Sequence, residues 1–193
     1  MKGRNIKSLR IIRALLDAPS GSLTKYRIAK RAECSVPWVI EFLRKLEAKR
    51  LVKKTKVLNT DKMIEWYIET MPKIKHFDFF VQDPLTFLKQ SKLEYALTTY
   101  AAENFASRHL FPSRYDIYIK AEDFDKWKSL ILEKGLLGRG NSRLNIAKDE
   151  LVFKEAKEIK GVKVVSMPQL LIDLKREGGV CIEAYNILVK RNV

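Results

Sequence analysis

Residues 22–68 read SLTKYRIAKRAECSVPWVIEFLRKLEAKRLVKKTKVLNTDKMIEWYI, and this stretch decides the fold of the first part of the chain. Helical periodicity predicts a short helix over residues 23–32, with Ser22 as its N-cap, and a second helix that begins at Ser35. The Ser35 hydroxyl is expected to accept a backbone N–H, and Pro37 is tolerated in the first helical turn. Apolar residues recur on the second helix at spacings of three and four, which predicts a buried stripe. This stripe consists of Val36, Val39, Leu43 and Leu46.

After these helices the hydropathy pattern changes to alternation. Residues 52–58 and 62–68 are predicted to be two strands, joined by turn residues at 59–61. A helix over residues 5–16 is expected to pack under the motif and to point Arg13 outward. Two helices that meet at a short turn and precede a basic hairpin are typical of a winged helix-turn-helix, whose second helix enters the major groove of DNA.

The charge of the chain is unevenly distributed. The formal net charge is +15; residues 1–75 hold 19 Lys/Arg and 7 Asp/Glu, and the remaining residues hold 19 and 16. A basic half beside a nearly balanced half predicts that one domain binds a polyanion. A thermophile-like surface rich in Lys, Glu and Ile would also explain the composition. We favour nucleic acid, because the basic residues coincide with the helix-turn-helix.

The predicted nucleic-acid interface lies on the outward faces of the two helices and on the hairpin. Basic residues of the first helix are expected to hold phosphates, which fixes the docking register. Trp38 has two interpretations: it contacts a sugar or a thymine methyl, or it covers the hairpin as a partly exposed core residue. Glu41 can accept a hydrogen bond from the N4 amino group of cytosine. The DNA-binding residues predicted are Lys25, Tyr26, Arg27, Ser35, Pro37, Trp38, Glu41, Arg44, Lys45, Lys53, Lys54, Lys56 and Lys62.

Cysteine content and hydropathy indicate the compartment. Cys34 and Cys181 are too few and too far apart for a disulfide framework or a zinc site. No apolar run approaches the ~20 residues that span a bilayer, and the polar start MKGRNIKSLR lacks the apolar core of a signal peptide. We expect a cytoplasmic protein with no membrane segment, no metal and no cofactor.

Residues 73–193 are predicted to form a second, α+β domain after a winged helix-turn-helix domain at 1–72. The segment 76–81 is interpreted as a connecting segment or a short strand. Strands are predicted at 95–98, 115–120, 142–147, 150–154 and 161–165, and helices at 84–93, 100–107, 122–134, 166–175 and 182–190. Ser166 and Gln169 have the spacing of a capping box. The final helices fit either the core of a monomer or a dimer face.

Three segments carry a resemblance: ALTTYAAENF at 96–105, RYDIYIKAEDFDKW at 114–127, and VKVVSMPQLLIDLKREGGVCIEAYNIL at 162–188. Together they resemble the C-terminal domain of AbiEi-type antitoxin regulators of type IV toxin–antitoxin systems, in which that domain follows a winged helix. The resemblance implies a transcriptional regulator that represses its own operon, a nucleotidyltransferase-like toxin encoded nearby, and a second domain related to a degenerate nucleotidyltransferase fold. A homodimer is expected where a winged helix reads a palindrome.

The second domain departs from the pattern of an active nucleotidyltransferase. Such an enzyme needs Gly-Ser near the first strand and two carboxylates alternating on the next, aimed at two magnesium ions. Here Thr98-Thr99 stands in the first place, and Asp116 shares its strand face with Tyr118 rather than with a second acid. Asp123 and Asp125 open a helix, where acids serve the dipole. We therefore expect no catalytic residues; the alternatives are a nucleotidyltransferase-like enzyme and an RNA-binding protein with a basic winged helix.

Overall fold

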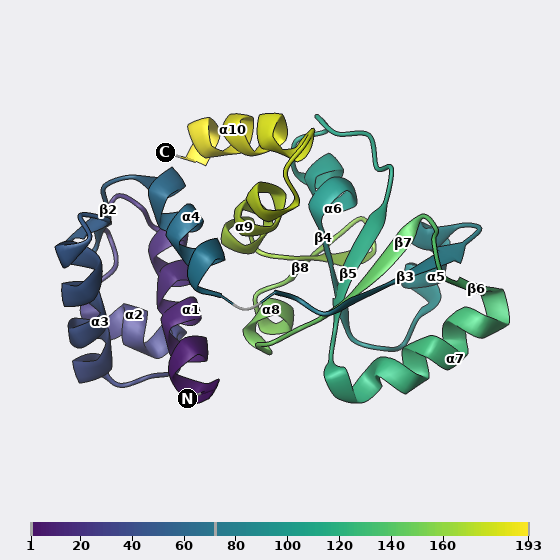
Figure 1. Cartoon of the computed structure of the whole chain (residues 1–193), viewed down its shortest axis with the longest axis horizontal. Helices are drawn as coiled ribbons and strands as arrows, with labels where there is room; N and C mark the ends of the chain where they lie inside the picture. The colour runs from purple at the N-terminus through teal and green to yellow at the C-terminus, as the bar shows by residue number, and fades with distance from the viewer. Residues whose placement is uncertain (1, 72, 193) are drawn as a thin grey trace. The chain divides into compact units, whose positions relative to one another are not determined.

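The structure, a computed structural model, describes residues 2–71 and 73–192 (Figure 1). The chain is of mixed α+β class and divides into two compact units, Met1–Pro72 with Asn186–Val193, and Lys73–Tyr185. Pro72, where the sequence suggests the boundary, lies outside the described residues. None of the helices described is long and apolar enough to cross a membrane.

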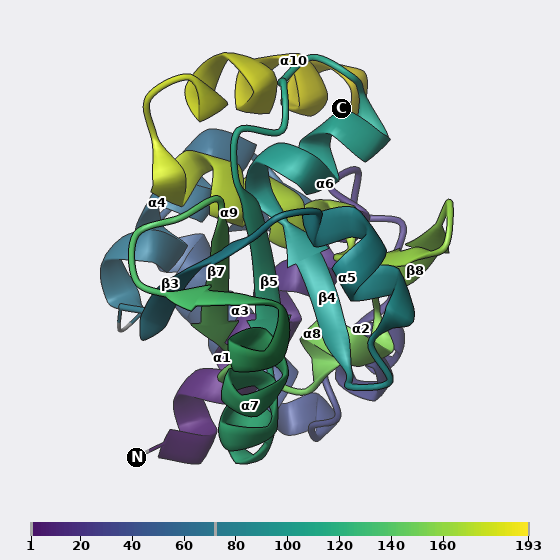
Figure 2. The ribbon, with the colours of Figure 1, turned by 90° about the vertical axis from the view of Figure 1, so that its right-hand side faces the viewer.

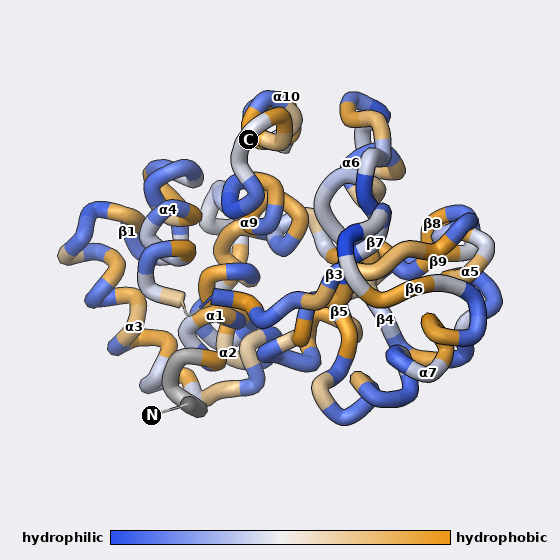
Figure 3. The backbone as a smooth tube through the Cα atoms, turned by 45° about the vertical axis from the view of Figure 1, so that its right-hand side comes forward, coloured by the Kyte–Doolittle hydropathy of each residue, from blue (hydrophilic) through white to orange (hydrophobic). Residues whose placement is uncertain are grey.

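The first unit consists of helices around an apolar core, with one small hairpin. Its elements are α1 (Lys2–Asp17), α2 (Lys25–Arg31), α3 (Val36–Ala48), β1 (Val52–Lys53), β2 (Lys56–Val57) and α4 (Thr60–Thr70). α2 packs against α1 and α3, α4 packs against α1, and the hairpin contacts both α3 and α1. Hydrophobic and hydrophilic residues alternate along α3 in Figure 3. Of the predicted stripe, Val39, Leu43 and Leu46 are buried and Val36 is half-buried; Phe42, which was not predicted, is buried with them.

The hairpin differs from the one that the sequence predicts. The segment 52–58 folds back on itself, so that Val52 pairs with Val57 and Lys53 with Lys56, while the predicted second strand, 62–68, belongs to helix α4. Lys54 makes the tight turn possible with a φ of 57°, in the left-handed region. The strand predicted at 62–68 is wrong because Met63, Ile64 and Tyr67 are buried, which is the spacing of a helical face.

Helix capping also differs in detail. The N-cap of α2 is Thr24, not Ser22, and its hydroxyl accepts the Arg27 N–H at 3.2 Å. Ser35 is the N-cap of α3 as predicted, but its side chain makes no capping hydrogen bond. Arg13, predicted to point outward, is buried. Arg13 lies between the buried residues Ile12 and Ala14. Because α1 is covered by α2, α4 and the hairpin, it is buried over more of its circumference than a helix with one neighbour, and this wide buried face includes Arg13.

Gly21 fixes the loop between α1 and α2 against the hairpin. Its φ is 84°, and a Cβ there would meet the Cβ and backbone nitrogen of Lys56 at 2.9 Å. Thr55 donates its hydroxyl hydrogen to the Gly21 carbonyl at 3.1 Å, and the Val57 N–H donates to Pro19 O at 2.9 Å. The hairpin is therefore attached to the α1–α2 loop as well as to α3.

The second unit is built on a seven-stranded mixed sheet of order β6-β3-β7-β5-β4-β9-β8. Its strands are β3 (His76–Val81), β4 (Tyr95–Thr98), β5 (Tyr115–Ile119), β6 (Gly135–Leu137), β7 (Ser142–Ile146), β8 (Lys157–Ile159) and β9 (Val162–Val164). Its helices are α5 (Pro84–Gln90), α6 (Thr99–Ala106), α7 (Phe124–Lys134), α8 (Leu151–Lys154), α9 (Met167–Glu177) and α10 (Cys181–Asn192). The 3-10 turn η1 (Ala121–Asp123) precedes α7. The last residues of α10, from Asn186 on, are grouped with the first unit. Of the predicted strands, 150–154 is wrong, since it is helix α8; the segment 76–81 is a strand inside the sheet.

The two faces of the sheet differ in chemistry. Figures 1 and 2 show α7 on one side of the sheet and α6 and α9 on the other. Under α7 lies an aromatic core, in which the Trp127 ring is 6.2 Å from that of Tyr95 and 6.1 Å from that of Phe87. The opposite face carries Asp116 and Tyr118, which alternation on β5 places together. Polar chemistry in this unit is therefore concentrated beneath α6 and α9.

We expect Gly21→Ala to lower the free energy of unfolding by about 2–4 kcal/mol, because the new Cβ adds a steric clash with the hairpin to the cost of a positive φ. Chemical denaturation measures the change. Gly179→Ala is the matched control: Gly179 has a φ of 53° and open space around its Cβ position, so the change should cost only about 1–2 kcal/mol. Equal losses of stability in the two variants would show that the hairpin does not press on Gly21.

Candidate functional site

The first unit places most of the predicted interface residues on solvent-exposed positions of neighbouring elements. Lys25, Tyr26 and Arg27 form the exposed first turn of α2, and the Tyr26 side chain is 69% exposed. A tyrosine this open contributes little to the core. Its ring and hydroxyl are free to meet a sugar or a phosphate.

On α3, the exposed face carries a mixture of charges. Pro37, Glu41, Arg44 and Lys45 are exposed, as is Ser35 at the N-cap. Glu41 holds Lys45 in an ion pair at 2.6 Å. The guanidinium of Arg44 is therefore the cation of this helix face that the structure leaves without an ion pair among the described residues.

Trp38 is half-buried, between the two interpretations that the sequence left open. The Lys7 ammonium lies 5.9 Å from its ring centroid, a cation–π contact. The Trp38 ring therefore contacts Lys7 of α1, while Phe42 of α3 and Trp66 of α4 pack with ring centroids 6.1 Å apart. Cys34 is half-buried in the turn before α3, and burial raises the pKa of its thiol above the usual value.

The hairpin presents Lys53, Lys54 and Lys56, all exposed. Its position relative to α3 is fixed because the Lys54 N–H donates to Glu47 Oε1 at 2.7 Å. Lys62, predicted to lie on the hairpin, is exposed in the first turn of α4, and its backbone N–H donates to Asn59 Oδ1 at 2.9 Å. Lys62 is thus separated from the three hairpin lysines by the helix N-cap.

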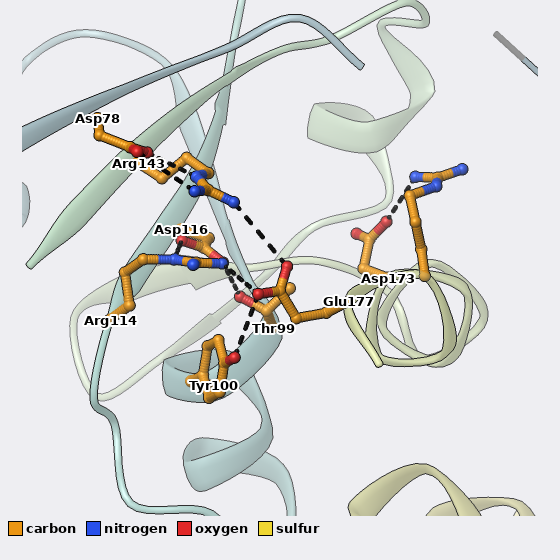
Figure 4. A network of polar contacts seen from close by, with 9 residues as sticks. Asp78, Thr99, Tyr100, Arg114, Asp116, Arg143, Asp173 and Glu177 are labelled. Carbon is orange, nitrogen blue, oxygen red and sulfur yellow. Dashed lines mark hydrogen bonds and ion pairs between the residues drawn. The ribbon is translucent and has the colours of Figure 1, made fainter. Parts of the chain in front are cut away.

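In the second unit, an ion network lies on the sheet face beneath α6 and α9 (Figure 4). Arg114 binds both carboxylate oxygens of Asp116, at 2.5 Å from Nε and 2.8 Å from Nη2, and the same Nη2 donates to Glu177 Oε1 at 2.8 Å. Asp116 is 1% exposed. Burial alone would lower the pKa of Arg114. The hydrogen bond and charge of Asp116 and the charge of Glu177 together outweigh burial, so the net effect raises the pKa of Arg114 well above its usual range.

A second arginine extends this network across the sheet. Arg143 on β7 binds Asp78 on β3, at 2.6 Å from Nε, and its Nη1 lies 4.0 Å from Glu177 Oε2. The hydrogen bond from Arg143 lowers the pKa of Asp78, which is only partly buried. Glu177, at the end of α9, thus lies between two guanidinium groups.

The strand–helix junction after β4 belongs to the same network. Thr99, whose φ is 50°, donates its hydroxyl hydrogen to Asp116 in a short hydrogen bond. A β-branched residue with positive φ is strained, so the contact with Asp116 helps to hold this backbone. Tyr100 donates to Glu177 Oε1 at 3.2 Å, and burial raises the pKa of its phenol far above the usual value. Burial likewise raises the pKa of the neighbouring Cys181 to about 11.

Asp173 on α9 lies beside this network and is held differently. Its carboxylate accepts from Thr98 Oγ1 at 2.7 Å and from Tyr118 Oη at 2.8 Å. The Gln169 amide nitrogen lies 3.0 Å from Asp173 Oδ1, so it binds within the helix rather than closing the predicted capping box with Ser166. Complete burial raises the pKa of Asp173, against the opposing effects of its donors and of Arg176.

The sequence identifies only part of this network. Strand alternation predicts that Asp116 and Tyr118 share a face, and the nucleotidyltransferase pattern drew attention to Thr98-Thr99; the structure brings these side chains to one site. The prediction from the sequence did not include Arg114, although that residue precedes Asp116 by two positions. The partners on β3, β7 and α9 carry no local signal. In the described part of the chain, no group of three or more His, Cys, Asp or Glu side chains is arranged to hold a metal ion.

We expect Asp173→Asn to change how stability depends on pH. Because the pKa of Asp173 is raised in the folded state, its protonation stabilises the fold; this contribution is complete below the unfolded pKa of about 3.9 and is lost as pH rises through the folded pKa. Asparagine does not titrate. The free energy of unfolding of the variant, minus that of the wild type, should therefore increase from acidic to neutral pH.

Denaturant titrations at a series of pH values measure this difference. Asp125→Asn is the control, since Asp125 is exposed in the first turn of α7, away from this network, and its replacement should not give a difference that increases with pH. A difference for Asp173→Asn that stays constant or decreases with pH would contradict a raised pKa.

The whole chain was compared with protein-family models, curated proteins and solved structures. No protein-family model, curated protein or solved structure matches it. Any function assigned to the chain therefore rests on its own residues and their geometry.

Proposed function

We propose that the chain is a sequence-specific double-stranded DNA-binding transcriptional regulator whose first unit acts as a winged helix-turn-helix. The observation that carries the proposal is the set of exposed cations on α2, α3 and the hairpin, above a core of apolar side chains. Within the described residues, the structure shows no ion pair from Lys25, Arg27, Arg44 or the hairpin lysines. Unpaired cations at rigid positions are what a polyphosphate backbone neutralises.

The arrangement of α2 and α3 supports insertion of α3 into a major groove. Residues 32–35 form the short connection between the two helices, and the Cys34 N–H donates to Ala29 O at 3.0 Å, which closes the turn. The exposed N-terminal part of α3, with Pro37 and Glu41, is the part that would meet base edges, and Arg44 follows one turn later. Arginine pairs bidentately with guanine, so Arg44 is the strongest candidate for base recognition.

The hairpin supports the role of a wing. It is held to α3 through Glu47 and to the α1–α2 loop through Gly21 and Pro19. Because these contacts fix the backbone of the hairpin, that backbone need not become ordered when the lysine side chains meet phosphates. The bound lysines position the helix, while the side chains of α3 read the sequence.

The finer proposal is an autorepressing antitoxin of a type IV toxin–antitoxin pair, whose second unit mediates assembly or contacts a nucleotidyltransferase-like toxin. It rests on the resemblance of the second unit. Its network also favours a role without catalysis, since Arg114 occupies both oxygens of Asp116, the acid that would otherwise be available to a magnesium ion. A nucleotidyltransferase with this site would need Arg114 to leave its carboxylate partners.

RNA is the alternative polyanion. Duplex RNA is bound by shape and by phosphate contacts, which a basic winged helix can also make. The two partners are distinguished by salt titrations with duplex DNA and structured RNA of matched length. Tighter binding to one DNA sequence than to other duplexes or to RNA supports the regulator, whereas preference for RNA at all salt concentrations contradicts it.

We expect the combined change of Lys53, Lys54 and Lys56 to Ala to weaken binding to all duplexes alike. The log–log dependence of affinity on salt should become shallower by about 0.9 for each phosphate that the variant no longer neutralises. Fluorescence anisotropy with labelled duplexes over a range of salt concentrations measures both effects. An unchanged salt slope would mean that the hairpin does not touch phosphates.

The second unit offers a matched control for this experiment. Strands β8 and β9 form another hairpin with three exposed lysines, Lys157, Lys160 and Lys163, and Lys160 has a φ of 51° much like that of Lys54. Changing these three to Ala removes the same charge from a hairpin of similar shape. The salt slope should then stay near the wild-type value.

Arg44→Ala should instead change which sequence is preferred, by about 1–3 kcal/mol of discrimination if Arg44 reads a guanine. Lys45→Ala is the control on the same helix face, because Lys45 is already paired with Glu41. Binding to a randomised duplex library, followed by sequencing of the bound fraction, measures both. If the two variants lose affinity equally and keep the same preference, α3 contacts only the backbone.

A further inference from the structure

Helix α1 contacts the N-terminal end of α3 through two cations. The Lys7 ammonium lies 5.9 Å from the Trp38 ring centroid. Arg10 Nη1 binds Glu33 Oε2 at 2.5 Å, in the turn before α3. Burial raises the pKa of the Cys34 thiol, and the charges of Lys7 and Arg10 both oppose that effect. Because Lys7 and Arg10 are three residues apart, one face of α1 is directed at the segment that opens α3.

The two cations of α1 differ in how their charge is compensated. The Arg10 side chain is only 14% exposed, and its guanidinium is paired with the Glu33 carboxylate. Lys7 is exposed, and among the residues described the structure shows it in a cation–π contact but in no ion pair. An aromatic ring compensates an ammonium at an exposed site only weakly. Lys7 therefore retains positive charge beside the N-terminal end of α3.

The contacts with α1 and with the hairpin lie on opposite sides of α3. Helix α1 reaches α3 at Trp38, and the hairpin reaches it at Glu47, whose Oε1 accepts the Lys54 N–H. These two positions are nine residues apart, which places them about 180° apart around the helix axis and about 14 Å apart along it. Glu41 and Arg44 lie between them at spacings of three, on the exposed side. The candidates for base recognition are therefore flanked by cations on both sides.

A helix in a major groove has a phosphate backbone on each side. The groove is about 12 Å wide, and a helix with its side chains is about 10–12 Å in diameter, so both flanks of the helix come close to phosphates. Cations on one flank would neutralise one strand only. Cations on both flanks bind both strands and thereby fix how the helix lies in the groove.

We propose that the DNA-binding surface extends onto α1, where Lys7 binds a backbone phosphate across the major groove from the phosphates that meet the hairpin lysines. This inference rests on the proposed function of the first unit. The Lys7 ammonium can bind phosphate while its aliphatic chain remains packed against Trp38. The contact carries no sequence information, but together with the hairpin it positions α3 for base recognition.

A salt titration of Lys7→Ala tests the phosphate contact. The log–log dependence of affinity on salt should become shallower by about 0.9, so that the loss of affinity between about 50 and 200 mM salt is about 3.5-fold smaller than in the wild type. Lys7→Arg, which keeps the charge, should retain the wild-type slope. Circular dichroism verifies that each variant is folded.

Lys75→Ala is the matched control. Lys75 is an exposed lysine of the second unit, and its ammonium lies 5.0 Å from the Phe77 ring centroid. Its replacement removes the same charge and the same kind of contact as Lys7→Ala, from a unit to which no DNA contact is assigned. The salt slope of this variant should equal that of the wild type.

Ethylation interference on a duplex selected from a randomised library locates the phosphates. In the wild type, the ethylated phosphates that weaken binding should form two sets, one on each side of the groove that α3 occupies. Lys7→Ala should lose one set. The combined change of Lys53, Lys54 and Lys56 to Ala should lose the other.

Three results would overturn the inference alone. These are an unchanged salt slope and affinity in Lys7→Ala, a loss of affinity at unchanged slope, which would mean that Lys7 acts only through Trp38, and loss of the same phosphates in both variants. In each case a wild-type chain that prefers one DNA sequence leaves the proposed function intact. A wild-type chain that binds no duplex, or that prefers RNA, overturns the proposed function and this inference with it.

Discussion

The Arg114–Asp116 ion pair determines much of the second unit. Asp116 is almost completely buried, and a carboxylate in that position requires a cation that can bind both oxygens. Arg114 supplies it from the same strand face and also binds Glu177, so the end of α9 is connected to β5. Removal of the guanidinium alone would leave the buried Asp116 without a cation, which costs more than the pair contributes. Arg114 is therefore one of the contacts that hold α9 on the sheet, together with Arg143 at Glu177 and with Thr98 and Tyr118 at Asp173.

The same pair fixes the direction of every side chain on its strand. Because alternation is strict, placing Asp116 and Tyr118 beneath α6 and α9 sends Ile117 and Ile119 to the opposite face. There they meet the core that contains Trp127. The first unit is built differently. Apolar side chains from its helices form the core, and the cations that, among the described residues, the structure shows in no ion pair are exposed at the surface. Buried ion pairs thus lie in the second unit, whereas ion pairs of the first unit, such as Glu41–Lys45, lie at its exposed surface beside these cations.

Local patterns explain which features the sequence could predict. The strand at 95–98 and the helix that begins after Ser166 are predicted with nearly correct limits, because each has a strong period and a clear breaker. The strand predicted at 62–68 is wrong, since its aromatic and β-branched residues favour a strand, yet Asn59 caps a helix there. Segment 150–154 is an apolar run too short for its period to separate helix from strand.

The candidate site divides in the same way. The cations of α2 and α3 could be placed because helical period alone decides which residues are exposed. The ion network could not, because its members come from β3, β5, β7 and α9. Glu177 is 63 residues from Arg114, and the residues around either one give no sign that the two side chains meet. Long-range pairing of charges depends on the sheet order, which no local pattern reveals.

Asp116 and Asp173 are two buried acids on one polar face, and each is stabilised in a different way. They lie on neighbouring elements and share threonine partners at the end of β4, since Thr99 binds one and Thr98 the other. Asp116 is compensated by a full positive charge from Arg114. Asp173 is surrounded mainly by neutral donors, and its burial raises its pKa, so protonation relieves the cost that no guanidinium offsets completely. Two carboxylates in one site would repel each other if both were ionised without a cation between them. One acid of this face is therefore paired with an arginine, and the other lies in an environment that favours its protonated form.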